Sequence, residues 1–476
     1  MDKDNCISRL GFLKGASFAA FAGVAGQVTA TGDGDVDATQ TRTAQLSQRP
    51  WLEADVVVAG GGPAGVCAAV SAARAGAKVV LAERFGCLGG NLTLGHVSPI
   101  LGKVCPGTMV DEVRRLLNAN HLNAPKVMTR NGPEEHIDHE EAKGVLAKLC
   151  ADAGVTVLLC APVIDAVMEG NRIVGIVVDT PKGLRNVRAK VVIDATGDGR
   201  VAMASGAVCK IGRDGDGATQ PSSLEFVVDG VDEKVGLTAW GGTDPVKLPS
   251  GEEYRALCKR MNAVGELPEN VTIVRLHRTF YPGERSVNAT QVNGVDALDP
   301  VAVGRADAEL RRQIDMCVAF LRKHVPGYEK CRVKSTADTL GVRETRRVMG
   351  DAMVVDDDLL EGRKYADAIV HDAWFLIDIH NPKGGGQAEG HSHPAKPYDI
   401  RYGAFLPKGV EGLLTAGRCI SGTHRAHASY RVMTPCMAMG EAVGVAAALA
   451  VQRGTTPRAV RAADVREALK QRGVKL

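Results

Sequence analysis

The sequence predicts an α/β fold built on a parallel sheet, and three observations support this class. An apolar strand at residues 55–59 leads through a glycine-rich turn into a helix at residues 63–75. A second apolar strand follows at residues 79–82 and ends on an acid, Glu83. Late in the chain, the apolar run at residues 413–416 again leads into a glycine turn and then a helix. Because strands that alternate with helices are typical of parallel sheets, we expect a Rossmann-like domain.

The turn after the first strand fits the dinucleotide-binding pattern G-x-G-x-x-G. Its first glycine allows a tight turn, its second lets the backbone approach a pyrophosphate, and its third lets the helix pack closely on the strand. Glu83 follows about 20 residues on, where a carboxylate can accept hydrogen bonds from a ribose. The pattern predicts a dinucleotide at the helix N-terminus, and the alternative is a glycine turn without a ligand. The turn and the start of the helix are formed by Gly60, Gly62, Pro63, Ala64 and Gly65.

The segment at residues 1–50 has the order of a secretory signal. Basic residues flank a short apolar run at residues 18–26, and a polar stretch follows, with a candidate cleavage point after Ala30. Residues 8–14 resemble the twin-arginine export signal S-R-R-x-F-L-K, but Leu10 replaces one arginine. We expect an exported, periplasmic or extracytoplasmic protein, with a cytoplasmic location and a disordered N-terminus as the alternative. This segment is expected to lie outside the fold.

The composition excludes several classes of protein. The net charge is +3 and the acids and bases are interleaved, so no nucleic-acid footprint is visible. The 12 cysteines are scattered and include no C-x-x-C pair, which argues against a zinc ribbon or a ferredoxin-type cluster. No apolar run is expected to reach the length of a membrane span. The composition is otherwise that of an ordinary soluble globular protein.

Between the first two strands and the middle of the chain, the pattern predicts two helices and a β-meander. The helices are expected at residues 109–117 and 137–153. Apolar runs then begin at Val155, Arg172 and Lys190, and the pair Gly170-Asn171 marks a hairpin turn between the first two runs. The meander leads into a buried parallel strand at residues 191–195.

The turn that ends this strand consists of small residues, Ala195-Thr196-Gly197. It continues as Asp198-Gly199, so that Gly197, Gly199 and Ala202 fit G-x-G-x-x-A. No strand-terminal acid follows at the right distance, so a second nucleotide motif is not expected. We interpret the turn as a close approach to the nucleotide that the first motif binds.

The chain is long enough for two lobes. Strand-like runs at residues 224–228 and 271–276 mix with helical runs at residues 254–264 and 303–324, which indicates an inserted α+β segment. The predicted domains are a signal and linker at 1–50, the first part of the nucleotide-binding domain at 51–211, an inserted substrate or cap domain at 212–335, the second part at 336–460 with 336–410 bridging back to it, and a tail helix at 461–476.

Four motifs in this order resemble a known family. They are G-x-G-x-x-G with Glu83, then VVIDATGDG, then GVRETRRVMGD, and then LLTAGRCISGTHRAHASYRVMTPCMAMG. Over residues 51–450 the chain resembles the bacterial FAD-dependent oxidoreductases of the glutathione-reductase-like flavoprotein superfamily, whose members have two dinucleotide-binding domains. The resemblance implies a non-covalently bound FAD. It also implies that the last helix points its N-terminus at the flavin, where a helix dipole stabilises the negative charge of the reduced ring.

Two departures from the superfamily limit the chemistry. No C-x-x-x-x-C stands beside the first helix, which argues against a dithiol reductase, and no second full fingerprint requires NAD(P)H. The electron acceptor and the oligomeric state are left open by the motifs.

The motif and the resemblance together predict the contacts with the cofactor, which lie in four parts of the chain. The predicted contacts are Gly60, Gly62, Pro63, Ala64, Gly65, Glu83, Arg84, Gly90, Asn91, Val163, Ala195, Thr196, Gly197, Gly417, Arg418 and Pro435.

Three residues are candidates for catalysis. His424 and Arg431 precede the helix that faces the flavin, and the resemblance places them near the reactive ring. His424 could instead be a hydrogen-bonding loop residue, and Arg431 could hold the flavin. Arg343 could bind an acidic group of the substrate through two hydrogen bonds. Its alternative is a structural network with Glu344 or Asp351.

Two further sets of residues were weighed against simpler roles. Cys419 and Cys436 could react if their thiols were activated, but packing is the preferred interpretation. His391 and His393, with His380 upstream, could bind zinc, although no clear fourth ligand is near, so no metal is predicted. The main hypothesis is therefore an FAD-dependent oxidoreductase. A metal-dependent hydrolase or lyase on the same scaffold and a flavin-binding protein without turnover are the alternatives.

Overall fold

A computed structural model of the protein describes residues 50–476, except residues 122–127, 130–131, 134–135 and 241–244. The predicted signal at residues 1–50 therefore lies almost wholly outside the described residues. The described chain from residue 50 onward belongs to one compact unit. The domain boundaries given above stay a prediction.

The central sheet has the strand order β5-β2-β1-β8-β7-β6, with β17 joining β8. Strand β1 lies between β2 and β8 and pairs in parallel with both, and β2 pairs in parallel with β5. The predicted α/β fold with a Rossmann-like parallel sheet is confirmed. The strands are β1 (Leu52–Ala59), β2 (Val79–Ala82), β5 (Thr156–Leu158), β6 (Val163–Glu169), β7 (Arg172–Val178), β8 (Arg185–Asp194) and β17 (Leu413–Thr415).

The meander is formed by β6, β7 and β8, which pair antiparallel, and the β6–β7 turn lies at Gly170 and Asn171 as predicted. The run that begins at Val155 does not form a single strand. Its first part, β5, is a parallel edge strand beside β2. The chain then turns at Cys160, whose φ is +52°, and Pro162 has no N–H to donate before β6 begins. One apolar run therefore contributes to two strands.

Strand β8 connects the two ends of the chain. Its first half pairs with β7, and its second half pairs on the same edge with β17, in the register Leu413↔Val192 and Thr415↔Asp194. The last strand of the sheet therefore lies next to β8, on the edge opposite β1. As a result, the turns that follow β1, β8 and β17 emerge at the same edge of the sheet.

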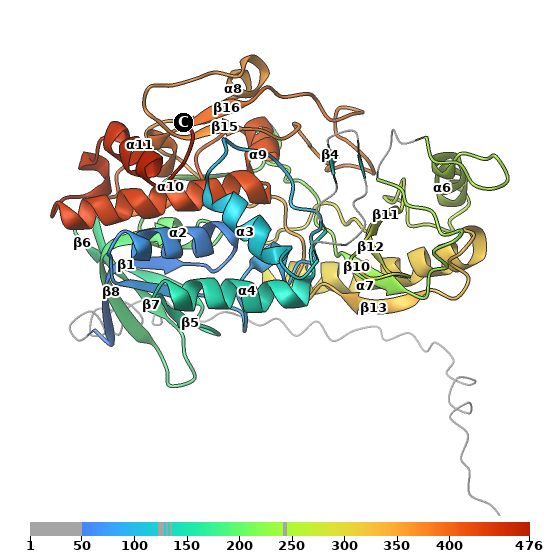
Figure 1. Ribbon diagram of the computed structural model, residues 1–476, viewed down its shortest axis with the longest axis horizontal. Coiled ribbons are helices and arrows are strands. Elements are labelled where there is room, and N and C mark those ends of the chain that lie inside the picture. The colour runs from blue at the N-terminus through green and yellow to red at the C-terminus, as the bar shows by residue number, and fades with distance from the viewer. Residues whose placement is uncertain (1–49, 122–127, 130–131, 134–135, 241–244) are drawn as a thin grey trace, which may run out of the picture. The chain divides into compact units, whose positions relative to one another are not determined.

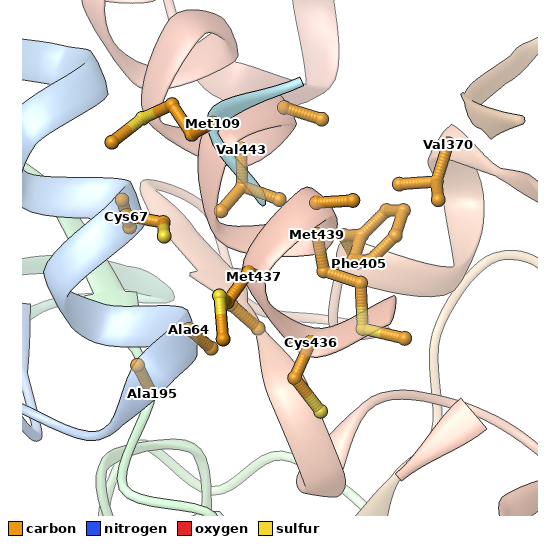
Figure 2. Packing of buried hydrophobic residues seen from close by; sticks show 14 of the residues in the cluster. Ala64, Cys67, Met109, Ala195, Val370, Phe405, Cys436, Met437, Met439 and Val443 are labelled. Carbon is orange, nitrogen blue, oxygen red and sulfur yellow. The ribbon is translucent and has the colours of Figure 1, made fainter. Parts of the chain in front are cut away.

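Helices α2 (Pro63–Arg74) and α10 (Met433–Gln452) lie side by side on the sheet (Figure 1). Glycines on α10 allow this close approach, since a Cβ at Gly440 would lie 2.0 Å from the carbonyl oxygen of Ala64, and one at Gly444 would lie 2.4 Å from that of Ala68. Figure 2 shows Ala64 and Met437 in this interface. The N-terminus of α2 is thus held in place by α10.

Helix α10 is the one described helix that is long and apolar enough to cross a membrane. The prediction that no apolar run reaches this length was wrong for this segment. In the structure, 89% of its most apolar window is buried. Its apolar composition is explained by its packing against α2, the sheet and the last helix of the chain, α11 (Ala462–Gln471).

Other helices flank this core. Helix α3 (Met109–Leu117) begins and ends as predicted, and α4 (His139–Asp152) is capped by Asp138, whose carboxylate accepts hydrogen bonds from the N–H groups of Glu140 and Glu141. Such a cap stabilises a helix by about 1 kcal/mol. The predicted tail helix is α11 (Ala462–Gln471).

A second hydrophobic cluster is formed by residues between Leu224 and Leu340. Its sheet has the order β11-β12-β10-β13, and helix α7 is capped by Asp299. The strand predicted at residues 271–276 begins four residues later, because Val271 and Val274 are buried in the cluster without sheet pairing. The elements are β10 (Phe226–Asp229), α6 (Tyr254–Ala263), β11 (Arg275–Arg278), β12 (Arg285–Asn288), α7 (Pro300–His324) and β13 (Arg332–Thr336).

The remaining described elements are short. Each is a strand pair, a short helix or a single 3-10 turn. They are β3 (Met128–Thr129), β4 (Gly132–Pro133), α5 (Arg200–Ala204), β9 (Cys209–Ile211), β14 (Arg346–Val348), α8 (Asp356–Glu361), β15 (Ala368–Ala373), β16 (Tyr398–Arg401) and α9 (His424–Tyr430), with 3-10 turns at Gly90–Leu92, Tyr402–Phe405, Gly417–Cys419 and Pro457–Ala459.

Candidate active site

One cavity of about 600 Å³ opens where the turns after β1, β8 and β17 meet. This is the carboxyl edge of the parallel strands, where open α/β sheets bind their ligands. The volume is in the range of small-molecule and cofactor sites. The predicted contacts that line it are Gly60, Gly62, Pro63, Ala64, Glu83, Arg84, Gly90, Asn91, Val163, Ala195, Thr196, Gly197, Gly417 and Arg418.

The glycines of the first turn have separate roles. Gly60 has a φ of +97°, and a Cβ there would lie 2.6 Å from the carbonyl oxygen of Ala195. At Gly62 a Cβ would meet no protein atom within 4 Å, so this face of the turn is open toward the cavity. Gly65 does not line the cavity, and a Cβ there would lie 1.8 Å from the oxygen of Gly60. It serves helix–strand packing, which is the role expected of the third glycine.

Glu83 closes the turn from below. Its carboxylate is buried and accepts hydrogen bonds from the N–H of Gly61, at 2.5 Å, and the N–H of Phe85, at 2.9 Å. These bonds fix the carboxylate at the wall of the cavity. Because each carboxylate oxygen has two acceptor positions, one on each stays available for a ribose hydroxyl.

The turn after β8 is held by Asp194, a residue that the sequence analysis missed. Its buried carboxylate accepts from the hydroxyl of Thr196 at 2.6 Å and from the N–H of Ala202 at 2.9 Å. Burial raises the pKa of Asp194. The sequence did carry a signal, because this acid directly follows the apolar strand residues Val192 and Ile193. A buried strand rarely ends on a carboxylate that has no partner.

Asp198 and Arg418 form an ion pair across the cavity wall. An Nη atom of Arg418 lies 2.5 Å from Asp198, and Arg84 approaches the same carboxylate at 3.5 Å. Burial acts to raise the pKa of Asp198, but the two guanidinium groups outweigh it and hold the pKa below its usual value. The pair links the turn after β8 to the turn after β17.

The helix that faces the cavity begins at Met433, two residues before the predicted start at Pro435. Met433 and Cys436 line the cavity, whereas Pro435 does not. Pro435 packs against Gly102 instead, where a Cβ would lie 2.8 Å from the proline ring. The positive end of the α10 dipole is at the cavity as expected, although the N–H of Thr434 already donates to the carbonyl oxygen of Leu101 at 3.1 Å and Pro435 has no N–H.

The three catalytic candidates occupy different positions. Arg431 lines the cavity, and its Nη2 lies 3.2 Å from the carbonyl oxygen of Asp378 and 3.5 Å from its carboxylate. His424 does not line this cavity. It lies in α9, within the segment expected to be a loop, and its Nδ1 is 2.9 Å from Glu344. It borders a second, more open cavity of about 500 Å³ that also contains Asp356, among other residues.

Arg343 does not line the cofactor cavity either, although its neighbour Val342 does. Neither of the structural networks proposed for it is present, because Glu344 pairs with Arg347 and Asp351 pairs with Arg458. Arg343 donates one hydrogen bond, from Nη1 to the carbonyl oxygen of Pro221 at 2.8 Å. Burial and the nearby Arg431 lower the pKa of Arg343 to about 10.

The histidines of the metal alternative have separate partners. His380 pairs with Asp378 at 3.2 Å, and His393 pairs with Glu389. Among the described residues, His380, His391 and His393 are not part of any group of three ligand atoms close enough to share an ion. The one such group there is His121, Asp138 and Glu141, in which Asp138 already caps α4 and accepts from Tyr281 at 2.6 Å.

The two cysteines near the cavity are packed. Cys436 is buried, and burial raises the pKa of its thiol to about 12. Its Sγ donates toward the carbonyl oxygen of Arg431 at 3.3 Å. Burial also raises the pKa of Cys419. Neither environment activates a thiolate.

The site therefore combines a glycine-rich turn before a helix N-terminus, an acid at the end of the next strand and the N-terminus of a second helix, which are the features expected of an FAD site. The chain belongs to the FAD-dependent oxidoreductase family, because the family model described as FAD dependent oxidoreductase matches residues 55–469. The expected FAD-dependent oxidoreductase family and the expected FAD cofactor are confirmed.

Similar proteins share part of this chain. A thiamine thiazole synthase from Desulfosudis oleivorans is 36% identical over 157 residues, which cover 31% of this chain and 57% of the relative. A digeranylgeranylglycerophospholipid reductase from Picrophilus torridus is 30% identical over 154 residues, which cover 30% of this chain and 39% of the relative. The chain thus matches 57% of the length of the first of these curated relatives and 39% of the second.

Solved structures with a similar arrangement have low sequence identity. The flavin-dependent brominase Bmp2 has a TM-score of 0.47 at 12% identity, covering 88% of this chain and 83% of that chain. A geranylgeranyl bacteriochlorophyll reductase-like protein from Thermoplasma acidophilum has a TM-score of 0.44 at 16% identity, covering 88% of this chain and 84% of that chain.

Proposed function

We propose that this protein is an oxidoreductase that transfers a hydride between a small organic substrate and non-covalently bound FAD. The observation that carries the proposal is the cavity itself. Three strand-end turns, the N-terminus of α2 and the N-terminus of α10 converge on it, and the cationic Arg431 stands at its wall. We also infer that the chain is of the bacterial, glutathione-reductase-like type, an inference supported by its four ordered motifs.

The residues of the cavity fit FAD. The open face of Gly62 and the free N–H groups of α2 suit the pyrophosphate, and Glu83 suits the ribose. The turn at Gly417, whose φ is +81°, brings backbone to the cavity beside Ala64. FAD supplies the hydride chemistry when bound, and the protein orients the cofactor and tunes its charge.

The protein's own contribution to the reaction is mainly electrostatic. The dipole of α10 and the guanidinium of Arg431 stabilise negative charge at the end of the cavity that they share. Asp378 keeps Arg431 in place through its carbonyl oxygen and carboxylate. The geometry favours Arg431 over His424 for a direct role, since His424 borders a different cavity.

The test is flavin binding by a variant that leaves the protein interior unchanged. Gly62 has a φ of −68°, and its Cβ position is free of protein atoms, so Gly62→Val should fold. We expect purified wild-type protein to be yellow and Gly62→Val to be colourless. Gly144→Val, at an exposed helical position with an equally free Cβ, is the matched control and should keep its flavin. Folded wild-type protein that cannot be loaded with FAD would overturn the proposal.

We further propose export, on the basis of the signal-like order of residues 1–50. Cell fractionation of the full chain and of a variant with Arg9→Gln measures this directly. We expect the full chain outside the cytoplasm and the variant inside it. Cytoplasmic full-length protein would contradict the proposal.

A further inference from the structure

A cluster of charged side chains adjoins the cofactor cavity at the Arg431 end. Arg431 itself lines the cavity, and Arg343 follows directly after Val342, which also lines it. The carboxylate of Asp378 lies 3.5 Å from Arg431 and also attracts the positive charge of Arg343. Arg275, on β11, is coupled to Asp378 and to Glu225, at the start of β10. The cluster therefore connects the cofactor cavity to the second hydrophobic cluster.

The charges of this cluster do not balance. Arg275, Arg343 and Arg431 contribute three positive charges, whereas Asp378 contributes one negative charge and its pKa is held well below the usual range. Burial raises the pKa of Glu225 to about 8, so that it is mostly protonated at neutral pH. Even an ionised Glu225 would leave a net charge of +1.

The surrounding groups do not supply the missing negative charge. The nearby His380 adds none, because burial and Arg343 lower its pKa to about 4. Glu344 is coupled to Arg431 but is engaged by Arg347 and by His424. Arg255 adds further positive charge on the side of Arg275. The three arginines are partly exposed, and Arg431 lines the cavity, so the unbalanced positive charge attracts an anion to this place.

Hydrogen-bond donors in the cluster are also unused. Gln220 is 3% exposed, and its Oε1 accepts from the N–H of His380 at 3.3 Å and from Arg431 at 3.5 Å. These contacts assign the other end of the amide as Nε2, which has no partner. Nε of Arg431 also has none. A set of free donors suits an acceptor-only ligand.

We propose that this cluster binds a carboxylate of the substrate, so that the enzyme acts on a small organic acid. The proposal rests on the proposed function, because it places the acid beside the flavin end of the cavity. The planar guanidinium groups of Arg343 and Arg431 match a carboxylate through paired hydrogen bonds. The net charge of +1 or +2 suits a mono- or dicarboxylate. Asp378 is the positioning residue that keeps Arg431 directed toward the ligand.

The test is the binding of acids to the holoenzyme. A panel of short mono- and dicarboxylic acids, their methyl esters and the corresponding phosphate esters is titrated, with thermal stabilisation and the visible spectrum of the bound flavin as readouts. We expect one or more acids to bind and the matching methyl esters not to bind. Phosphate esters that bind while every acid fails would overturn the carboxylate assignment, and so would esters that bind as tightly as the acids.

Two variants and one control sharpen this test. Arg343→Gln should weaken acid binding about 10- to 100-fold without loss of flavin. Gln220→Glu places a carboxylate in the cluster, and we expect it to raise the melting temperature without ligand and to abolish acid binding. The control, Arg332→Gln, removes an exposed arginine that pairs with Asp229. It should change neither acid binding nor the melting temperature. If Gln220→Glu destabilises the free protein and binds acids normally, the cluster is not an anion site.

These outcomes separate the two proposals. Loss of acid binding in yellow, flavin-loaded variants supports the acid site, and unchanged binding in the same variants refutes it. Folded wild-type protein that cannot be loaded with FAD, but that acids nevertheless stabilise, would refute the proposed flavoenzyme function and support the anion site.

Discussion

The contact between α2 and α10 makes a strong prediction about a single methyl group. In Gly440→Ala, the new Cβ would lie 2.0 Å from the oxygen, 2.9 Å from the carbonyl carbon and 3.1 Å from the Cα of Ala64. Non-bonded carbon atoms pack at roughly 3.5 Å, so the helices must separate by about 1.5 Å at this point. The atoms in contact are backbone atoms, which cannot change rotamer to make room.

The expected cost is at the upper end of overpacking, about 3 kcal/mol in the free energy of unfolding. The displacement also moves the first turn of α2, which follows the nucleotide-binding glycines, so the affinity for FAD should fall as well. Gly144→Ala is the matched control, because Gly144 is an exposed helical residue in α4 whose Cβ would meet no atom within 4 Å. Alanine there should stabilise the helix by about 0.5–1 kcal/mol.

The assay is urea unfolding of both variants, followed by circular dichroism with and without added FAD, together with a titration of FAD into the flavin-free proteins. We expect the two alanines to change stability in opposite directions and only Gly440→Ala to weaken FAD binding. If Gly440→Ala unfolds at the wild-type urea concentration and binds FAD normally, the close approach of α2 and α10 does not position the cofactor site.

Two further predictions concern buried titratable groups. Burial raises the pKa of Glu441 from 4.5 to about 7, so the folded protein binds this proton more tightly than the unfolded chain, and stability falls as the pH rises through that interval. Glu441→Gln should therefore gain about 3 kcal/mol relative to wild type across the same interval, measured by urea unfolding at successive pH values; a difference that does not change with pH would refute this. Alkylation of the native protein at mildly alkaline pH, followed by peptide mapping, should label the exposed Cys160 long before the buried Cys436. Equal rates would show that Cys436 is activated.

The cofactor side of the site was predictable because its chemistry is local. A glycine turn between a strand and a helix, followed by an acid, restricts both backbone geometry and ligand, so Gly60, Gly62 and Glu83 could be assigned from spacing alone. The same reasoning identified the turn at Ala195. It missed Asp194 and Asp198 because their importance depends on partners that only the folded sheet supplies.

The substrate side was less predictable because its residues meet only through tertiary packing. Gln220 and Asp378 come from separate irregular segments, and no periodic pattern marks either one. His424 was placed near the flavin by the family resemblance, whereas helix α9 directs it toward Glu344 and a different cavity. The strand expected at residues 271–276 shows the same limit, since an apolar run records burial without specifying pairing.

The insertion of β17 beside β8 has a consequence for how the protein is made. During synthesis, the segment with Gly60 leaves the ribosome early, and the segment with Gly417 and Cys436 leaves it near the end of the described chain. The nascent chain therefore has only part of the cavity for most of its synthesis. We expect FAD to be acquired after translation, in a step that joins the two ends and completes the central sheet. A ribosome-bound chain that stops before β17 should not retain flavin.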